Sequence, residues 1–328
     1  MDIIVDYQEV FESLRRNERW HTDKNILRFA ALTLVGSEPG DPGKRVRTIA
    51  TRLRKESGAF SPLASDLRHA VAAILLRRGF NPLAIVREVE RTLALFKKHK
   101  LRKGGAHPFL AALLLVMQAQ GSRVSEGSVA RLTEIVRRWA EDHFFLTGVD
   151  DYPMAALHAT RSVSIEQLAV DVELIYQLLR QARFSRGNQL QLVSHLLAFS
   201  SHRPHKAVER FQAMAEELRK RGQRIWQSQY DEVALLVLGG ARLDRAAART
   251  IELRDRLREF RPRPRASIAF SIASGLVLAE QLKKVEGLEG ASTAASLRSV
   301  QTVIEAQQAA MVAGIIVATT AATTAAAT

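Results

Sequence analysis

Short apolar stretches recur along this chain at nearly regular intervals. Each of the seven is four residues long, lacks Lys, Arg, Asp and Glu, and contains Ala or Leu. Their second residues, which lie 39 to 44 positions apart, are Ala30, Ala72, Ala111, Ala155, Ser194, Ala234 and Ala273. A period of this length across most of a chain is typical of repeat architectures, in which each repeat is one supersecondary unit.

A longer amphipathic segment precedes most of these stretches. Within Pro82–Lys98, Ile85, Val89 and Leu93 repeat at four-residue steps, which places them on one face of an α-helix. Asn81 is a good N-cap residue, and Pro82 suits the first turn. The stretch that follows is apolar on most sides, so its helix should be the more buried one. Each repeat is therefore predicted to be a hairpin of one amphipathic helix and one inner helix.

The hairpins imply a fold class and a domain organisation. A hairpin with one almost wholly apolar helix cannot bury that helix alone, whereas a stack of hairpins can. We therefore predict an all-α protein with about seven repeated αα-hairpins over residues 1–290. They would stack as a superhelix or as a closed α/α toroid, and we favour the open or partly closed form.

The C-terminal residues 291–328 depart from this pattern. The last charged residue is Glu305, and the chain ends in Ala and Thr. Length alone would permit a membrane span, but Ala and Thr are weakly apolar and no basic or aromatic anchors flank the segment. We expect a helix packed on the repeat domain or on a partner chain. A frayed tail and a membrane tail are the alternatives.

The absence of cysteine among the 328 residues narrows the chemistry. It excludes disulfide frameworks, thiolate metal sites and cysteine nucleophiles, and it fits a reducing compartment. Residues 1–16 show no secretion signal, so we expect a cytoplasmic protein. The sequence also contains no P-loop, no Gly-rich dinucleotide turn, no nucleophile elbow and no His-Glu-x-x-His zinc motif. No cofactor and no metal site is therefore assigned.

The chain is strongly basic, with 48 Lys and Arg against 34 Asp and Glu and a net charge of +14. Such an excess favours anionic partners. Most segments that join the two helices of a hairpin are basic, and they should share one rim of the stack. The predicted anion-binding rim consists of Lys97, Lys98, Lys100, Arg102, Lys103, Arg183, Arg186, Arg221, Arg224, Arg261 and Arg263. Cations near helix C-termini also offset the helix dipole, which is the alternative explanation.

One connector carries two adjacent carboxylates instead. Asp150 and Asp151 precede an inner helix, where they are ordinary caps, hard-cation ligands or a general base. The neighbouring connector, with Asn188, should lie beside them. The predicted ligand cleft consists of Asp150, Asp151, Tyr152, His158, Asn188, Gln189 and His195. For the two histidines, a hydrogen-bonded role in the core is the alternative.

Three segments carry a resemblance to a known family. Phe145–Pro153, Gly187–Gln191 and Ser194–Leu197 resemble a bacterial family of uncharacterised proteins, domain-of-unknown-function family 4003. The resemblance covers most of the chain, from the first hairpin to the Ala-rich end. It implies a cytoplasmic bacterial protein of helical type, and it implies no activity, ligand or catalytic residue.

Three functions follow as hypotheses. The first is a non-enzymatic helical-repeat protein that binds a protein or an anionic partner, because stacked repeats present extended binding surfaces. The second is an enzyme or metal-dependent ligand binder at the Asp150/Asn188 rim. The third is a nucleic-acid-associated protein that uses the basic rim, although no nucleic-acid-binding motif is visible. The sequence assigns no substrate and no oligomeric state.

Overall fold

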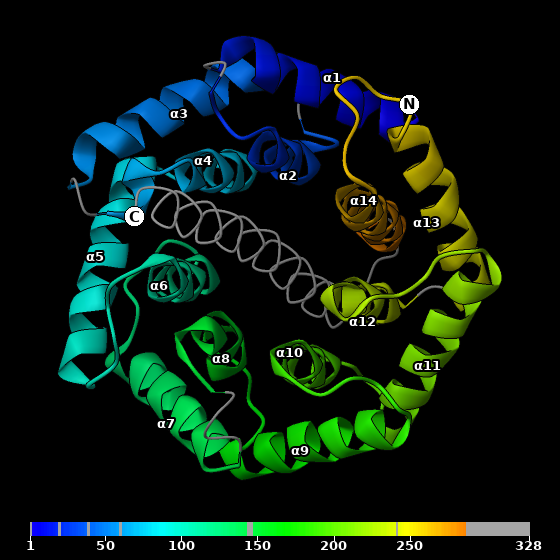
Figure 1. The fold of residues 1–328 in the computed structure, drawn as a ribbon. Helices are drawn as coiled ribbons and strands as arrows, with labels where there is room; N and C mark the ends of the chain where they lie inside the picture. The colour runs from blue at the N-terminus through cyan, green and yellow to red at the C-terminus, as the bar shows by residue number, and fades with distance from the viewer. Residues whose placement is uncertain are drawn as a thin grey trace, which may run out of the picture. The chain divides into compact units, whose positions relative to one another are not determined.

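A computed structural model describes residues 2–18, 21–37, 40–58, 61–142, 147–240 and 242–286. Within these ranges the secondary structure consists of fourteen α-helices and three short 3-10 helices, with no strand (Figure 1). The prediction of an all-α protein is therefore confirmed. The predicted C-terminal helix, residues 291–328, lies outside the described residues. In the part of the chain that is described, no helix is both long and apolar enough to span a membrane.

The helices alternate between two kinds along the chain. The amphipathic ones, called A helices here, are α1 (Ile3–Asn17), α3 (Pro42–Glu56), α5 (Pro82–Lys98), α7 (Glu126–Asp142), α9 (Ile165–Gln181), α11 (Pro204–Lys220) and α13 (Leu243–Leu257). The more apolar ones, called B helices, are α2 (Lys24–Leu34), α4 (Leu67–Arg78), α6 (Ala106–Gln118), α8 (Tyr152–Ala159), α10 (Asn188–Leu197), α12 (Tyr230–Leu238) and α14 (Ala266–Glu286). Each of the seven recurring apolar stretches lies in a B helix.

The pattern of apolar residues explains how deeply the A helices and the B helices are buried. In α6, every residue from Pro108 to Met117 is buried. In α5 the buried residues lie on one face only, because apolar residues three or four apart share a face. The side chain of Asn81 caps α5 by accepting hydrogen bonds from the backbone N–H groups of Leu83 and Ala84, at 3.0 and 3.3 Å. The predicted helix Pro82–Lys98 and α5 coincide.

The chain divides into two compact units within α7, after Thr133. In unit 1, α1, α3 and α5 pack against one another in order, and α2 packs against α4. Each of these A helices also packs against the B helix that follows it. Unit 2 begins at Glu134 and has the same arrangement, with α9, α11 and α13 in order and α8, α10, α12 and α14 in order (Figure 1). Within each unit, helices therefore pack both inside a pair and between neighbouring pairs.

Candidate functional site: the connectors and the buried polar row of unit 2

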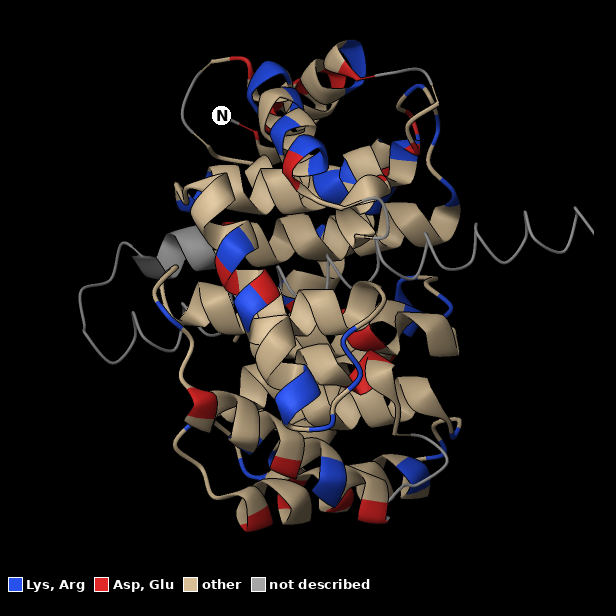
Figure 2. Cartoon of the chain, turned by 90° about the vertical axis from the view of Figure 1, so that its left-hand side faces the viewer, with Lys and Arg blue, Asp and Glu red and all other residues tan. Residues whose placement is uncertain are grey.

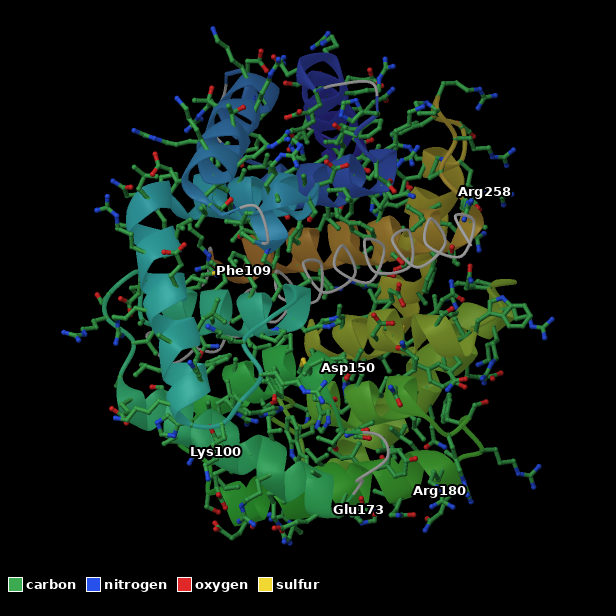
Figure 3. The ribbon with its side chains drawn as sticks, turned by 60° about the vertical axis from the view of Figure 1, so that its left-hand side comes forward. Lys100, Phe109, Asp150, Glu173, Arg180 and Arg258 are labelled. Carbon is green, nitrogen blue, oxygen red and sulfur yellow. The ribbon has the colours of Figure 1, made fainter. Side chains whose placement is uncertain are left out.

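The predicted cleft residues all lie in unit 2, within α8 and α10 or in the turn just before α8. Asp150 and Asn188 are exposed, and the side-chain amide of Asn188 donates to Asp150 Oδ2 at 3.4 Å. Their two connectors therefore lie side by side. The position of Asp150 is labelled in Figure 3. Gln189 is half-buried. The remaining four residues are buried, and they are Asp151, Tyr152, His158 and His195.

The Asp151 carboxyl closes the turn that leads into α8. Its Oδ2 accepts a hydrogen bond of 2.8 Å from the backbone N–H of Gly148. Burial raises the pKa of Asp151 to about 7; the bond from Gly148 opposes this rise, and the nearby Asp150 charge adds to it. Burial disfavours the charged form of a carboxyl in this way, because the buried carboxylate loses most of its hydration. Near neutral pH the Asp151 carboxyl therefore exists in both protonation states.

The two predicted histidines belong to an aromatic cluster in the core. His158 Nε2 lies 3.0 Å from the carbonyl oxygen of His195, and since a carbonyl oxygen only accepts, Nε2 donates. The His195 ring stacks on Trp139 with 3.7 Å between centroids, and the His158 ring stacks on Phe199 at 4.0 Å. His195 Nε2 is 3.9 Å from Asp151 Oδ1, which is longer than a hydrogen bond.

No metal centre is formed by these residues. In the described ranges, no group of three or more His, Asp or Glu side chains is placed to hold a metal ion. Both ring nitrogens of His158 also lie next to protein atoms. Nε2 donates to the carbonyl oxygen of His195, and Nδ1 lies 3.2 Å from the Arg161 guanidinium. The geometry of His158 is that of a hydrogen-bonded core side chain.

A row of buried polar side chains, which the sequence reasoning missed, occupies one repeat position in unit 2. Asp151, Gln191, Asp231 and Ser271 are spaced by 40 residues and are only 8, 1, 5 and 8% exposed. They lie at or near the starts of successive B helices that pack against one another. We call these four residues, together with Glu232, the polar row. The 40-residue spacing of these polar residues is visible in the sequence, but a repeat defined by its apolar residues does not include it.

The carboxyl of Glu232, like that of Asp151, has a raised pKa. Burial raises its pKa well above the ordinary value, and the charge of Asp231 and a hydrogen bond between the two side chains act in the same direction. The Ser271 hydroxyl donates to Glu232 Oε1 and opposes the rise. Within the described residues, Glu232 Oε2 and Gln191 Oε1 have no hydrogen-bond partner. Such groups cost stability, so the polar row is a candidate functional feature.

The predicted anion-binding rim is mostly exposed. Its unit 1 members lie at the end of α5 and on the connector from α5 to α6. All are exposed, and they are Lys97, Lys98, Lys100, Arg102 and Lys103. Lys98 is paired with Glu126 at 2.6 Å. In unit 2, Arg221 is half-buried and paired with Glu217, one helical turn earlier. The other unit 2 members are exposed, and they are Arg183, Arg186, Arg224, Arg261 and Arg263.

Hydrogen bonds join neighbouring connectors in unit 2. The side-chain amide of Gln227 donates to the carbonyl oxygen of Arg186 at 2.9 Å, and the Ser185 N–H donates to the Tyr230 hydroxyl at 3.3 Å. Arg254, near the end of α13, donates to Gln223 Oε1 at 2.6 Å. The connectors from α9 to α10 and from α11 to α12 are therefore held side by side, with the end of α13 attached to the second.

Seven exposed arginines on the connectors from α9 to α10, from α11 to α12 and from α13 to α14 form what we call the connector surface. They are Arg183, Arg186, Arg224, Arg258, Arg261, Arg263 and Arg265. Within the described residues, none of the seven has a carboxylate within 4.0 Å. Figure 2 shows Lys and Arg positions on several connecting loops, and Figure 3 shows Arg258 at the edge of the ribbon. Arg258 and Arg265 lie on the same basic connector as Arg261 and Arg263.

Arg183 occupies a backbone conformation that glycine prefers. It follows α9 with φ 65°, and the next residue, Phe184, bonds back to the Leu179 carbonyl at 3.2 Å. The same closure ends α11, where the equivalent residue is Gly222 with φ 77°. A left-handed conformation costs a non-glycine residue about 1 kcal/mol. The local backbone would therefore be more stable with glycine at position 183, and backbone stability does not explain the arginine there.

We expect Arg183→Gly to raise the free energy of unfolding by up to about 1 kcal/mol, because it removes this strain. Gly222→Arg is the matched reverse change. No neighbouring atom lies within 4 Å of a Cβ built there, so only the backbone strain should act, and stability should fall by about 1 kcal/mol. Urea unfolding of both variants measures the two effects. A loss of stability in Arg183→Gly would show that the arginine makes a stabilising contact.

The fold and the connectors define an all-α protein of paired helices with an exposed basic connector surface. A sequence profile of the family described as "Protein of unknown function (DUF4003)" matches residues 10–309, and the chain belongs to this family. The family resemblance of the sequence is thereby confirmed. The chain is also similar to the uncharacterized protein YeaA of Bacillus subtilis (strain 168), with 25% identity over 326 residues that span 96% of this chain and 94% of that protein. No solved structure matches it significantly.

Proposed function

We propose that this protein is a non-enzymatic helical-repeat binding protein whose connector surface holds an acidic partner. The observation that carries the proposal is the set of seven exposed arginines without carboxylate partners on the connectors that follow three neighbouring helices, α9, α11 and α13. Arginine suits this role because its planar fork binds carboxylates and phosphates through paired hydrogen bonds. An uncompensated group of like charges raises the local concentration of anions.

The helix dipole does not account for this surface. Arg183 and Arg258 follow the ends of α9 and α13, where a cation is favourable. Arg186 and Arg265, in contrast, lie two residues and one residue before the starts of α10 and α14. The N-terminal end of a helix carries positive partial charge, so a cation is unfavourable there and an anion is favourable. Arginines and helix N-termini on the same connectors both favour an anionic partner.

The stacking of the hairpins and the cellular location of the protein are part of the same proposal. The hairpins would form one repeat domain over residues 1–290, as an open superhelix or a closed α/α toroid, with residues 291–328 packed on it or on a partner. Stacked repeats give the extended surfaces that binding proteins use. A cytoplasmic location agrees with the lack of cysteine.

A second candidate is an enzyme or ligand binder at the Asp150/Asn188 rim. The raised pKa of Asp151 favours it, because perturbed carboxyls gather at functional sites. Against it, one Asp151 oxygen is occupied by the Gly148 N–H, and the nearby His158 and His195 stack in the aromatic cluster. The connector surface is therefore the better-supported site.

Heparin chromatography tests the proposed function. We expect the protein to bind at low salt, and the triple variant Arg183→Gln, Arg186→Gln, Arg224→Gln to elute at a clearly lower salt concentration. The matched control changes Arg15, Arg137 and Lys206 to Gln, which removes the same charge from side chains that are already paired with glutamates on their own helices. It should elute close to the wild type. Equal shifts in the two variants, or no retention of the wild type, would contradict the proposal.

A further inference from the structure

One aromatic side chain lies exposed among the connector arginines. Trp226 is 53% exposed, whereas Trp139 is 2% exposed. The Arg224 guanidinium lies 3.6 Å from the centre of a Trp226 ring. The backbone around Trp226 is held in place, because its N–H donates to Gln229 Oε1 at 3.2 Å and the next residue, Gln227, is bonded to the neighbouring connector. The indole is thus presented to solvent on a fixed turn.

An exposed indole beside unpaired arginines has a specific consequence for the partner. A large apolar ring left in water is unfavourable, and the arginines alone would suffice to bind a chain of carboxylates. A nucleobase, however, offers a flat π-face that stacks on an aromatic ring, while its phosphate is bound by arginine. The bases of a duplex are already stacked on one another, so only a single strand can use the indole in this way.

Resting on the proposed function, we propose that the acidic partner is a single-stranded nucleic acid, with its phosphates on the connector arginines and one base stacked on Trp226. Neighbouring packed helices lie about 10 Å apart, so the three connectors that carry these arginines form a strip of roughly 20 Å. At a rise of about 3.4 Å per nucleotide, such a strip covers on the order of six nucleotides. This length is within the range of single-strand binding sites on small domains.

Two readouts test the inference with oligothymidylate of about 12 nucleotides: the tryptophan emission of the wild type, and, for every variant, the fluorescence anisotropy of the dye-labelled oligonucleotide. At low salt we expect the oligonucleotide to quench the emission of the wild type. Trp226→Ala should bind it about 5- to 150-fold more weakly, the loss that one stacked base implies. Trp226→Phe keeps a smaller ring and should recover part of the affinity. Because Trp226 is exposed, these variants should keep the wild-type circular dichroism spectrum.

Three further ligands separate a general affinity for polyanions from the binding of a single strand. They are polyglutamate, heparin and a DNA duplex of the same length as the oligothymidylate. All variants at Trp226 should bind polyglutamate and heparin as the wild type does, and the wild type should bind the duplex more weakly than the single strand. If Trp226→Ala binds oligothymidylate as tightly as the wild type, or if the duplex binds equally well, the inference is overturned while the proposed function stands. If no polyanion binds at low salt, the proposed function and the inference both fail.

Discussion

Asp151→Asn is expected to raise the free energy of unfolding by about 2–4 kcal/mol at pH 8 and to change it little at pH 4. The Asp151 pKa rises from 3.8 in the unfolded chain to about 7 in the folded protein, and each pKa unit corresponds to about 1.4 kcal/mol. Asparagine has nearly the shape of the protonated carboxyl, and its amide oxygen can still accept from the Gly148 N–H. The variant therefore avoids the cost of a buried charge without losing the turn.

The pH window of this effect follows from proton linkage. Between about pH 4 and pH 7, the folded protein holds the Asp151 proton that the unfolded chain has released, so wild-type stability falls as the pH rises. The raised pKa of Glu232 acts in the same direction. Urea unfolding at pH 4, 6 and 8 measures the difference between the wild type and Asp151→Asn. Asp150→Asn, at an exposed position, is the control and should change stability by less than about 0.5 kcal/mol. A difference for Asp151→Asn that is constant with pH would contradict the account.

Trp139→Ala is expected to lower the free energy of unfolding by about 3–5 kcal/mol, the range for removal of a large buried aromatic side chain. Trp139 is 2% exposed, stacks on His195 at 3.7 Å and meets His158 edge-on at 5.8 Å. It thereby joins α7 to α8 and α10. Its loss leaves a cavity between these three helices.

Trp226→Ala is the matched control for Trp139→Ala, because it removes the same side chain from an exposed position. Trp226 is 53% exposed, so Trp226→Ala should cost less than about 1 kcal/mol. Thermal or urea unfolding of the two variants measures the contrast. A loss below about 1 kcal/mol for Trp139→Ala would show that the aromatic cluster is not part of the core, and it would make His158 and His195 available for another role.

The helices could be predicted from the sequence because their apolar spacing and end signals are local. The range of α5 follows from Asn81, Pro82 and the four-residue step of its apolar residues, and the apolar B helices follow from stretches without charge. The predicted rim includes Arg221, although Glu217, four residues earlier, is a visible partner for it. Charge alone did not show which arginines are already paired.

The parts that could not be predicted depend on packing between distant residues. The stacking of His195 on Trp139 joins positions 56 residues apart, and no local pattern reports it. The polar row was readable from its 40-residue spacing, but the burial of Asp231 and Glu232 depends on the neighbouring B helices. The sequence does not single out Trp226, because the exposure of its side chain follows from the path of its connector.

The salt dependence of polyanion binding tests the connector surface most directly. The logarithm of the binding constant for a heparin oligosaccharide should fall linearly with the logarithm of the salt concentration, since each neutralised anionic group releases a counterion. For the triple variant Arg183→Gln, Arg186→Gln, Arg224→Gln we predict a slope smaller by about three, one for each lost contact. A slope equal to that of the wild type would contradict the assignment of the binding surface to these connectors.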